Sequence, residues 1–120
     1  MDNLKDNPVV PVSVTVDKDG AGNVTISCAP NPVPVDAAHA LIGFNLDTAG
    51  YRFRAVRTIE LDEPDSDFPF PSWTVSPTLA TLLDLCQTVD TFKYTVHVVD
   101  TKTGEEYSVD PEIKNGGATC

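Results

Sequence analysis

The chain has 120 residues, of which 41% are hydrophobic, and eighteen acidic residues against eight basic ones give it a formal charge of −10. A chain of this length forms one domain and buries a core without a metal or a disulfide. Its carboxylates repel phosphate and anionic lipid, which excludes non-specific binding to nucleic acid and membranes, and no segment approaches the about 20 apolar residues of a membrane helix.

Alternating hydrophobic residues in the N-terminal quarter predict two strands that form a hairpin. Apolar residues two positions apart lie on the same face of a strand, as they do in residues 10–16. Gly20 and Gly22 supply the turn that follows. The inner face of the second strand carries Val24, Ile26 and Cys28.

The next part of the chain predicts a crossover, two strands and a loop. The alternate prolines of residues 30–34 have no amide donors, so this segment is expected to cross between sheets in an extended form. Residues 42–46 are expected to form a third strand, and residues 51–61 a long fourth strand with a bend or bulge near Arg57. Residues 62–72 are then a loop.

The C-terminal part predicts a short strand at residues 73–75, one short helix and a second hairpin. Ser76 followed by proline is typical of a helix start, and leucines continue at helical spacing to Cys86. Residues 92–98 alternate more clearly than any other segment, and residues 107–109 complete the hairpin.

These elements predict an all-β fold, an antiparallel β-sandwich of about seven strands with one short helix. Residues 8–113 form the single domain in this interpretation, and residues 1–7 and 114–120 form flexible tails.

One segment resembles a known family in more detail. Asp90-Thr91-Phe92-Lys93-Tyr94-Thr95-Val96 resembles the stretch that enters strand F of immunoglobulin domains. The resemblance implies an immunoglobulin-like sandwich in which the Tyr94 hydroxyl bonds back to nearby backbone. Val96 stands where the family has its disulfide cysteine, and Phe44 where it has tryptophan. Architecture of this kind does not supply a function.

A second resemblance covers the C-terminal third. Residues 94–100 (YTVHVVD) and 107–115 (YSVDPEIKN) look like the ending of small uncharacterised bacterial proteins named for Asp-Pro and Glu-Pro dipeptides, and of the AidA/PixA type. Asp110-Pro111 and Glu63-Pro64 are such dipeptides. The resemblance implies a bacterial cytosolic source and carries no assigned chemistry.

The N-terminus and the cysteines favour a cytoplasmic protein. The first seven residues are polar and lack the apolar stretch of a secretion signal. Cys28, Cys86 and Cys120 make an odd number without CxxC spacing, and we expect buried thiols at the first two and a free thiol in the tail.

Nothing in the sequence assembles a catalytic site or requires a cofactor. There is no nucleophile elbow, cysteine–histidine signature or phosphate-binding loop. His39 and His97 are the two histidines, and His97 is expected to face solvent on the opposite side of its strand from Tyr94. We therefore expect a protein that is not an enzyme.

Two acidic segments raise the question of calcium. Residues 17–23 resemble the opening of a calcium loop, but Cys28 stands where the last acidic ligand belongs, so a glycine-rich turn is the favoured interpretation. The second segment holds four acids that either bind a cation weakly or are simply solvated: Asp62, Glu63, Asp65 and Asp67.

The same loop concentrates aromatic residues between prolines. Phe68, Phe70 and Trp73 either recognise a partner or a glycan, or else Phe70 and Trp73 plug one end of the sandwich and Phe68 is the exposed ring. Arg52 and Arg54 either clamp an anionic partner or pair with carboxylates on neighbouring strands.

The function predicted from these features is a non-catalytic binding or assembly module that binds a protein partner or forms a homodimer through a sheet edge or face. The last strand, ending at Asp110-Pro111, is the expected edge. The alternative is a glycan- or calcium-binding domain centred on residues 62–73.

Overall fold

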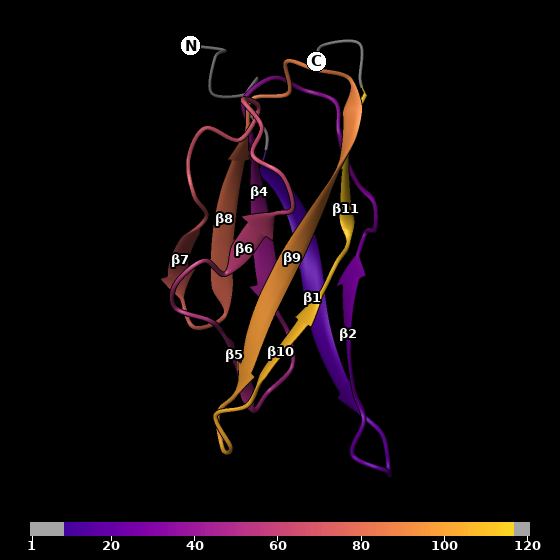
Figure 1. The fold of residues 1–120 in the computed structure, drawn as a ribbon, viewed down its shortest axis with the longest axis vertical. Coiled ribbons are helices and arrows are strands. Elements are labelled where there is room, and N and C mark those ends of the chain that lie inside the picture. Colours follow the sequence, from indigo (N-terminus) through magenta and orange to yellow (C-terminus); the bar gives the residue numbers. More distant parts are fainter. Residues whose placement is uncertain (1–8, 117–120) are drawn as a thin grey trace.

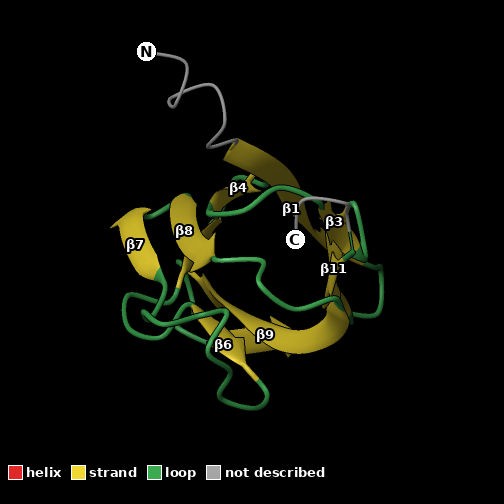
Figure 2. Ribbon diagram, turned by 90° about the horizontal axis from the view of Figure 1, so that it is seen from above, coloured by secondary structure: helices red, strands yellow, loops and turns green. Residues whose placement is uncertain are grey.

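The computed structural model describes residues 9–116, which form eleven β-strands and no helix. The strands make two mixed sheets that pack together (Figure 1). Seen from above, the strands of both sheets surround a common interior (Figure 2). The all-β, two-layer part of the prediction is therefore confirmed.

The first sheet has five strands in the order β2-β1-β4-β8-β7. Its β1–β2 hairpin is the one predicted, whereas β1 and β4 pair in parallel, which corrects the expectation of purely antiparallel sheets. The strands are β1 (Val9–Lys18), β2 (Val24–Ala29), β4 (Ala40–Leu46), β7 (Trp73–Ser76) and β8 (Leu79–Asp84).

The second sheet is built on both edges of its longest strand. Val96 of that strand pairs with Ile59 and also with Val109, so the two partners lie on opposite edges. One edge carries β5 and β6, and the other carries β10 and β11, with β3 parallel to β11. The strands are β3 (Val33–Val35), β5 (Tyr51–Phe53), β6 (Ile59–Leu61), β9 (Asp90–Asp100), β10 (Glu106–Val109) and β11 (Glu112–Asn115).

A bulge interrupts the long strand expected at residues 51–61. The amide of Arg54 donates to the carbonyl of His97 at 3.1 Å, and the amide of His97 donates to the carbonyl of Thr58 at 3.0 Å. Residues 54–58 thus bulge out opposite a single residue of β9, and Arg57 within them has a φ of 54°. The predicted interruption near Arg57 is confirmed.

The helix expected at residues 76–86 is wrong, because Leu79–Asp84 is strand β8. Its buried side chains alternate as Ala80, Leu82 and Asp84. A carboxylate at the third inward position breaks the apolar alternation, and the leucines on both faces then imitate a helical period.

The core lies between the two sheets and centres on Tyr94 of β9. Its ring lies 5.5 Å from that of Phe44 on β4, tilted by 59°. The Tyr94 hydroxyl is buried without a backbone partner, and the Cys28 side chain is its polar neighbour. The hydrogen bond that the immunoglobulin resemblance implied for Tyr94 is therefore not formed.

Three smaller expectations are also corrected. Cys28 is a free thiol whose pKa burial raises to about 11, but Cys86 is disulfide-bonded, and the expectation for Cys120 lies outside the described residues. Strand β11 continues through Asn115, so residues 114 and 115 belong to the fold rather than to a tail. The expected edge is corrected in part, because a further strand, β11, follows β10 and pairs with β3, whereas β10 itself is the end strand of its sheet.

Candidate functional site

The aromatic residues of the loop before β7 lie opposite to their expected places. Phe68 is buried, and its ring meets that of Phe92 edge to face at 5.1 Å. Phe70 is 62% exposed and Trp73 70% exposed. The ring that was expected to be exposed therefore anchors the loop, and the two that were expected to plug the sandwich face solvent.

Hydrogen bonds accepted by Asp65 shape the loop, and one accepted by Asp67 attaches it to the body of the protein. Asp65 Oδ1 accepts the amide of Asp67 at 2.9 Å, and the Asp65 carbonyl accepts the amide of Phe68 at 3.0 Å. The carbonyl of Asp67 accepts the amide of Leu85 at 2.7 Å. At the other end, the Ser72 hydroxyl accepts the amide of Ile59 at 3.1 Å. A loop held at both ends loses little conformational entropy when a partner binds.

A buried polar cluster lies beneath this loop. The fully buried Asp67 carboxylate accepts the amides of Gln87 and Thr88, both at 3.1 Å, and the Asn115 side-chain amide at 3.2 Å. The same Asn115 Nδ2 donates to Asp84 Oδ1 at 3.0 Å. Asp84 Oδ2 and Asn115 Oδ1 are buried without a hydrogen-bond partner.

The pKa of Asp84 follows from this environment. Burial raises the pKa of its carboxyl to about 6, against the hydrogen bonds from Asn115 and from the amide of Cys86. The carboxylates of Asp67 and Asp65 raise it further. Burial and like charge both disfavour the ionised form.

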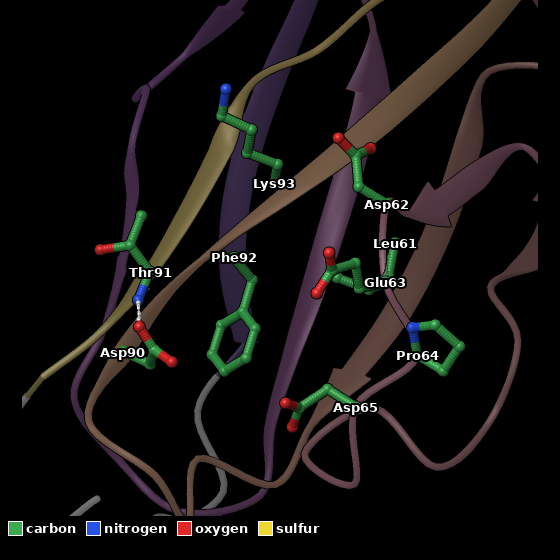
Figure 3. Close-up of a pocket in the computed structure, with 9 residues that line it drawn as sticks. All are labelled: Leu61, Asp62, Glu63, Pro64, Asp65, Asp90, Thr91, Phe92 and Lys93. Atoms are coloured by element: carbon green, nitrogen blue, oxygen red, sulfur yellow. Dashed lines mark hydrogen bonds between the residues drawn. The ribbon is translucent and has the colours of Figure 1, made fainter.

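An acidic hollow of about 300 Å³ opens beside the loop. The Phe92 ring lies in its middle with the carboxylates of Glu63, Asp65 and Asp90 around it, while the Lys93 ammonium points away (Figure 3). A hollow with an apolar floor and anionic walls suits a cationic group that carries hydrocarbon.

An apolar groove of about 310 Å³ adjoins the acidic hollow. Both are bounded by Leu61, Pro64 and Asp65, and the groove is further bounded by Phe68 and Phe70. Since Phe68 contacts Phe92, the aromatic floor continues from one depression to the other.

The four carboxylates proposed as cation ligands do not converge. Asp67 points into the protein and accepts three N–H donors, while Asp62, Glu63 and Asp65 border the acidic hollow. Within residues 9–116, no group of three or more His, Cys, Asp or Glu side chains is arranged to hold a metal ion.

We therefore expect millimolar calcium to leave the thermal midpoint unchanged within about 1 °C, because ligands stabilise a protein only when they bind its native state. Differential scanning fluorimetry with and without calcium measures this, with magnesium as the control for ionic strength. A rise of several degrees that is specific to calcium would contradict it.

The other acidic segment is a turn, as favoured from the sequence. Asp19 Oδ1 accepts the amides of Ala21 and Asn23, both at 2.9 Å, and Asp19 Oδ2 accepts the Asn23 side chain at 3.2 Å. Chiefly the backbone hydrogen bond from Asn23 lowers the pKa of Asp19. Its carboxylate closes the turn.

Arg54 pairs within the protein, whereas Arg52 does not share its network. Arg54 reaches Glu60 and Glu106, both at 3.0 Å, and its guanidinium also donates to the carbonyls of Val56 and Arg57.

His97 completes the network, with Nε2 2.8 Å from Glu60. Burial alone would raise the pKa of Glu60, but the hydrogen bonds from His97 and Arg54 outweigh burial and lower this pKa. The cross-strand interpretation is confirmed for Arg54, and the solvent-facing His97 is in fact half-buried between two glutamates.

We expect Arg54→Met to lower the free energy of unfolding by about 1–2 kcal/mol, because the bulge loses two carbonyl contacts and two ion pairs. Urea denaturation measures the loss. Arg52→Met is the matched control, since Arg52 is exposed and, among residues 9–116, its side chain reaches only the Phe53 carbonyl, at 3.4 Å. Equal losses in the two variants would contradict the role of Arg54.

Asp84 and Asn115 were missed by sequence reasoning. Asp84 was placed on a helix and Asn115 in a tail, and neither has a neighbouring residue pattern that marks a buried polar position. Only the pairing of β8 and β11 with their neighbours brings the two side chains together.

Comparisons with known proteins do not assign the chain to a family. The part of the chain that the structure describes contains no helix long and apolar enough to cross a membrane. The chain matches no protein-family model, and no curated protein matches it significantly.

Proposed function

We propose that this chain is a non-catalytic binding module that takes a segment of another polypeptide in the apolar groove and the acidic hollow. The observation that carries the proposal is the shared boundary of the two depressions at Leu61, Pro64 and Asp65. A segment with a hydrophobic residue beside a lysine or arginine fits both depressions at once, because one receives the side chain and the other the charge.

The fixed loop and the exposed Phe70 support this proposal. An exposed aromatic side chain on a loop that is fixed at both ends is the kind of residue that contributes most to an interface. The chain's formal charge of −10 also speeds encounter with a basic segment.

The non-catalytic part rests on how the titratable groups are used. His97 is paired with Glu60 and Glu106, and Asp67 is occupied by three N–H donors. General acid–base chemistry needs a group within reach of a substrate, and these side chains are already occupied by protein partners. We also propose an immunoglobulin-like classification of the sandwich, supported by the packing of Phe44 on Tyr94.

A peptide library tests the proposal. The probes are fluorescent decapeptides that contain one Phe or Leu and two Lys at varied separations, with matched peptides in which Glu replaces Lys. We expect the basic peptides to bind in fluorescence anisotropy, more weakly as salt increases, and the acidic ones not to bind.

Variants of the protein locate the site. Phe70→Ala is expected to weaken binding by at least about tenfold, and Asp65→Asn by about threefold, because the amide keeps the turn but removes the charge. Asp17→Asn is the control, because Asp17 is exposed near the C-terminal end of β1 and lines neither the groove nor the hollow. The strands of the first sheet, β1 among them, are shown in Figure 1. An effect of Asp17→Asn equal to that of Asp65→Asn would reduce the binding to non-specific attraction. Binding of neutral oligosaccharides that Phe70→Ala abolishes would assign the groove to a glycan instead.

A further inference from the structure

Strand β6 leaves one of its edges unpaired. Within the described part of the chain it pairs only with β9, and the flanking Thr58 and Asp62 each form a backbone hydrogen bond of 3.0 Å with that strand. In an antiparallel pair every second residue bonds to the partner strand, so the backbone groups of Ile59 and Leu61 point to the opposite edge. There the Ser72 hydroxyl accepts the Ile59 amide at 3.1 Å, whereas the Ile59 carbonyl and both backbone groups of Leu61 have no hydrogen-bond partner among residues 9–116.

The apolar groove runs along this unpaired edge. All three residues of β6 line it, together with residues 68–72 of the loop. Just before β6 begins, the hydroxyls of Thr58 and Thr74 are hydrogen-bonded to each other, which ties the two sheets together at that end. After Leu61 the groove continues into the acidic hollow, with which it shares part of its boundary. The free backbone groups of β6 therefore face an open groove rather than a neighbouring strand.

We propose that the partner segment lies in this groove as an extended strand and pairs with the free edge of β6. This mode of binding rests on the proposed function, since it requires that a polypeptide segment occupies the groove. Unpaired N–H and C=O groups on a strand edge are a template for a further strand, and strand addition is a recurrent mode of peptide recognition. One N–H and two C=O groups of β6 are free, so the partner supplies one C=O and two N–H groups. In either strand direction, these two N–H donors belong to residues two positions apart.

Polarity and charge select the side chains of the partner strand. Side chains of a strand alternate between its two faces, and those that enter the groove meet apolar residues such as Phe68 and Leu82. Where the partner strand passes the end of β6, it reaches the carboxylates of Glu63 and Asp65 in the acidic hollow. The occupant is therefore an extended segment with an apolar side chain in the groove and a lysine or arginine beyond it. Proline at either donor position would remove a required N–H.

A scan of backbone N-methylation tests the added strand. The probe is the basic decapeptide that binds the full chain most tightly, methylated at one amide nitrogen at a time. Methylation of either of two residues that lie two positions apart is expected to weaken binding at least about fivefold in fluorescence anisotropy, because each removes one hydrogen bond to β6. Methylation of the residue between them is the matched control. It is expected to change the affinity by less than about twofold, since that amide points away from β6.

Amide hydrogen exchange of the full chain, followed by NMR, locates the added strand on β6. We expect saturating peptide to slow exchange of the Leu61 amide at least about tenfold. The Asp62 amide is expected to change less, because it already bonds to β9. Equal effects of methylation at all three peptide residues, or new protection on β7 or β10 instead of Leu61, would overturn the added strand while the proposed function stands. Failure of every basic peptide to bind would overturn both.

Discussion

Asp67→Ala is expected to lower the free energy of unfolding by about 3 kcal/mol, which is among the largest effects that a single change in this chain can have. The carboxylate accepts the amides of Gln87 and Thr88 and the side chain of Asn115. Alanine leaves the two backbone amides without this acceptor, and the Asn115 side chain keeps only Asp84 Oδ1. Urea denaturation followed by tryptophan fluorescence and circular dichroism measures the loss.

Two further variants make this result specific. Asp67→Asn keeps one acceptor oxygen and replaces the other with a donor, so an intermediate loss is expected. Glu63→Ala removes an exposed acid from the same loop and is expected to change stability by less than about 0.5 kcal/mol. If Asp67→Ala and Glu63→Ala were equally mild, the buried cluster would not hold the loop.

Asp84→Asn is expected to stabilise the protein at pH 7 by about 2 kcal/mol and to leave it unchanged near pH 4. Burial raises the pKa of the Asp84 carboxyl to about 6 in the folded protein, whereas an unfolded aspartate has a pKa of about 4. The folded state therefore holds its proton between these values while the unfolded state has lost it. The contribution of Asp84 to stability is complete below about pH 4, and it falls as the pH rises to about 6.

The side-chain amide introduced by Asp84→Asn can also donate a hydrogen bond to Asn115 Oδ1, which has no donor in the unmodified protein. Its Nδ2 replaces Oδ2, and the buried Asn115 Oδ1 of the same cluster is an acceptor without a donor. The measurement is the difference in the free energy of unfolding between the two proteins at several pH values, because the other acids cancel in that difference. A difference that is constant from pH 4 to pH 7, or larger at pH 4, would contradict the assignment.

The strands that the sequence predicts correctly are those in which apolar residues alternate without interruption. Val12, Val14 and Val16 of β1 and Tyr94, Val96 and Val98 of β9 are all buried as expected. Even the bulge at Arg57 is visible in the sequence, because an arginine stands where the apolar face should continue. Burial of alternate side chains is a local property of a strand, and local patterns report it.

The predictions that were wrong concern features that depend on contacts between distant parts of the chain. Strand β8 looks helical because Asp84 faces inward, and one of the two donors to that carboxylate is Asn115, 31 positions later in the chain. Phe68 and Phe70 are both followed by proline and are only two positions apart, and it is the contact with Phe92 on a distant strand that marks Phe68 as the buried ring. The parallel pairing of β1 with β4 and of β3 with β11 has no local signature either.

The central place of β9 in the second sheet has a consequence for biosynthesis. Four strands pair with it, and two of them, β5 and β6, precede it in the chain. During synthesis, β5 and β6 leave the ribosome before β9 does. They can form their backbone hydrogen bonds with β9 only after residues 94–100 have left the exit tunnel. The first sheet has all its strands by residue 84, so its inner face remains without a cover throughout that interval.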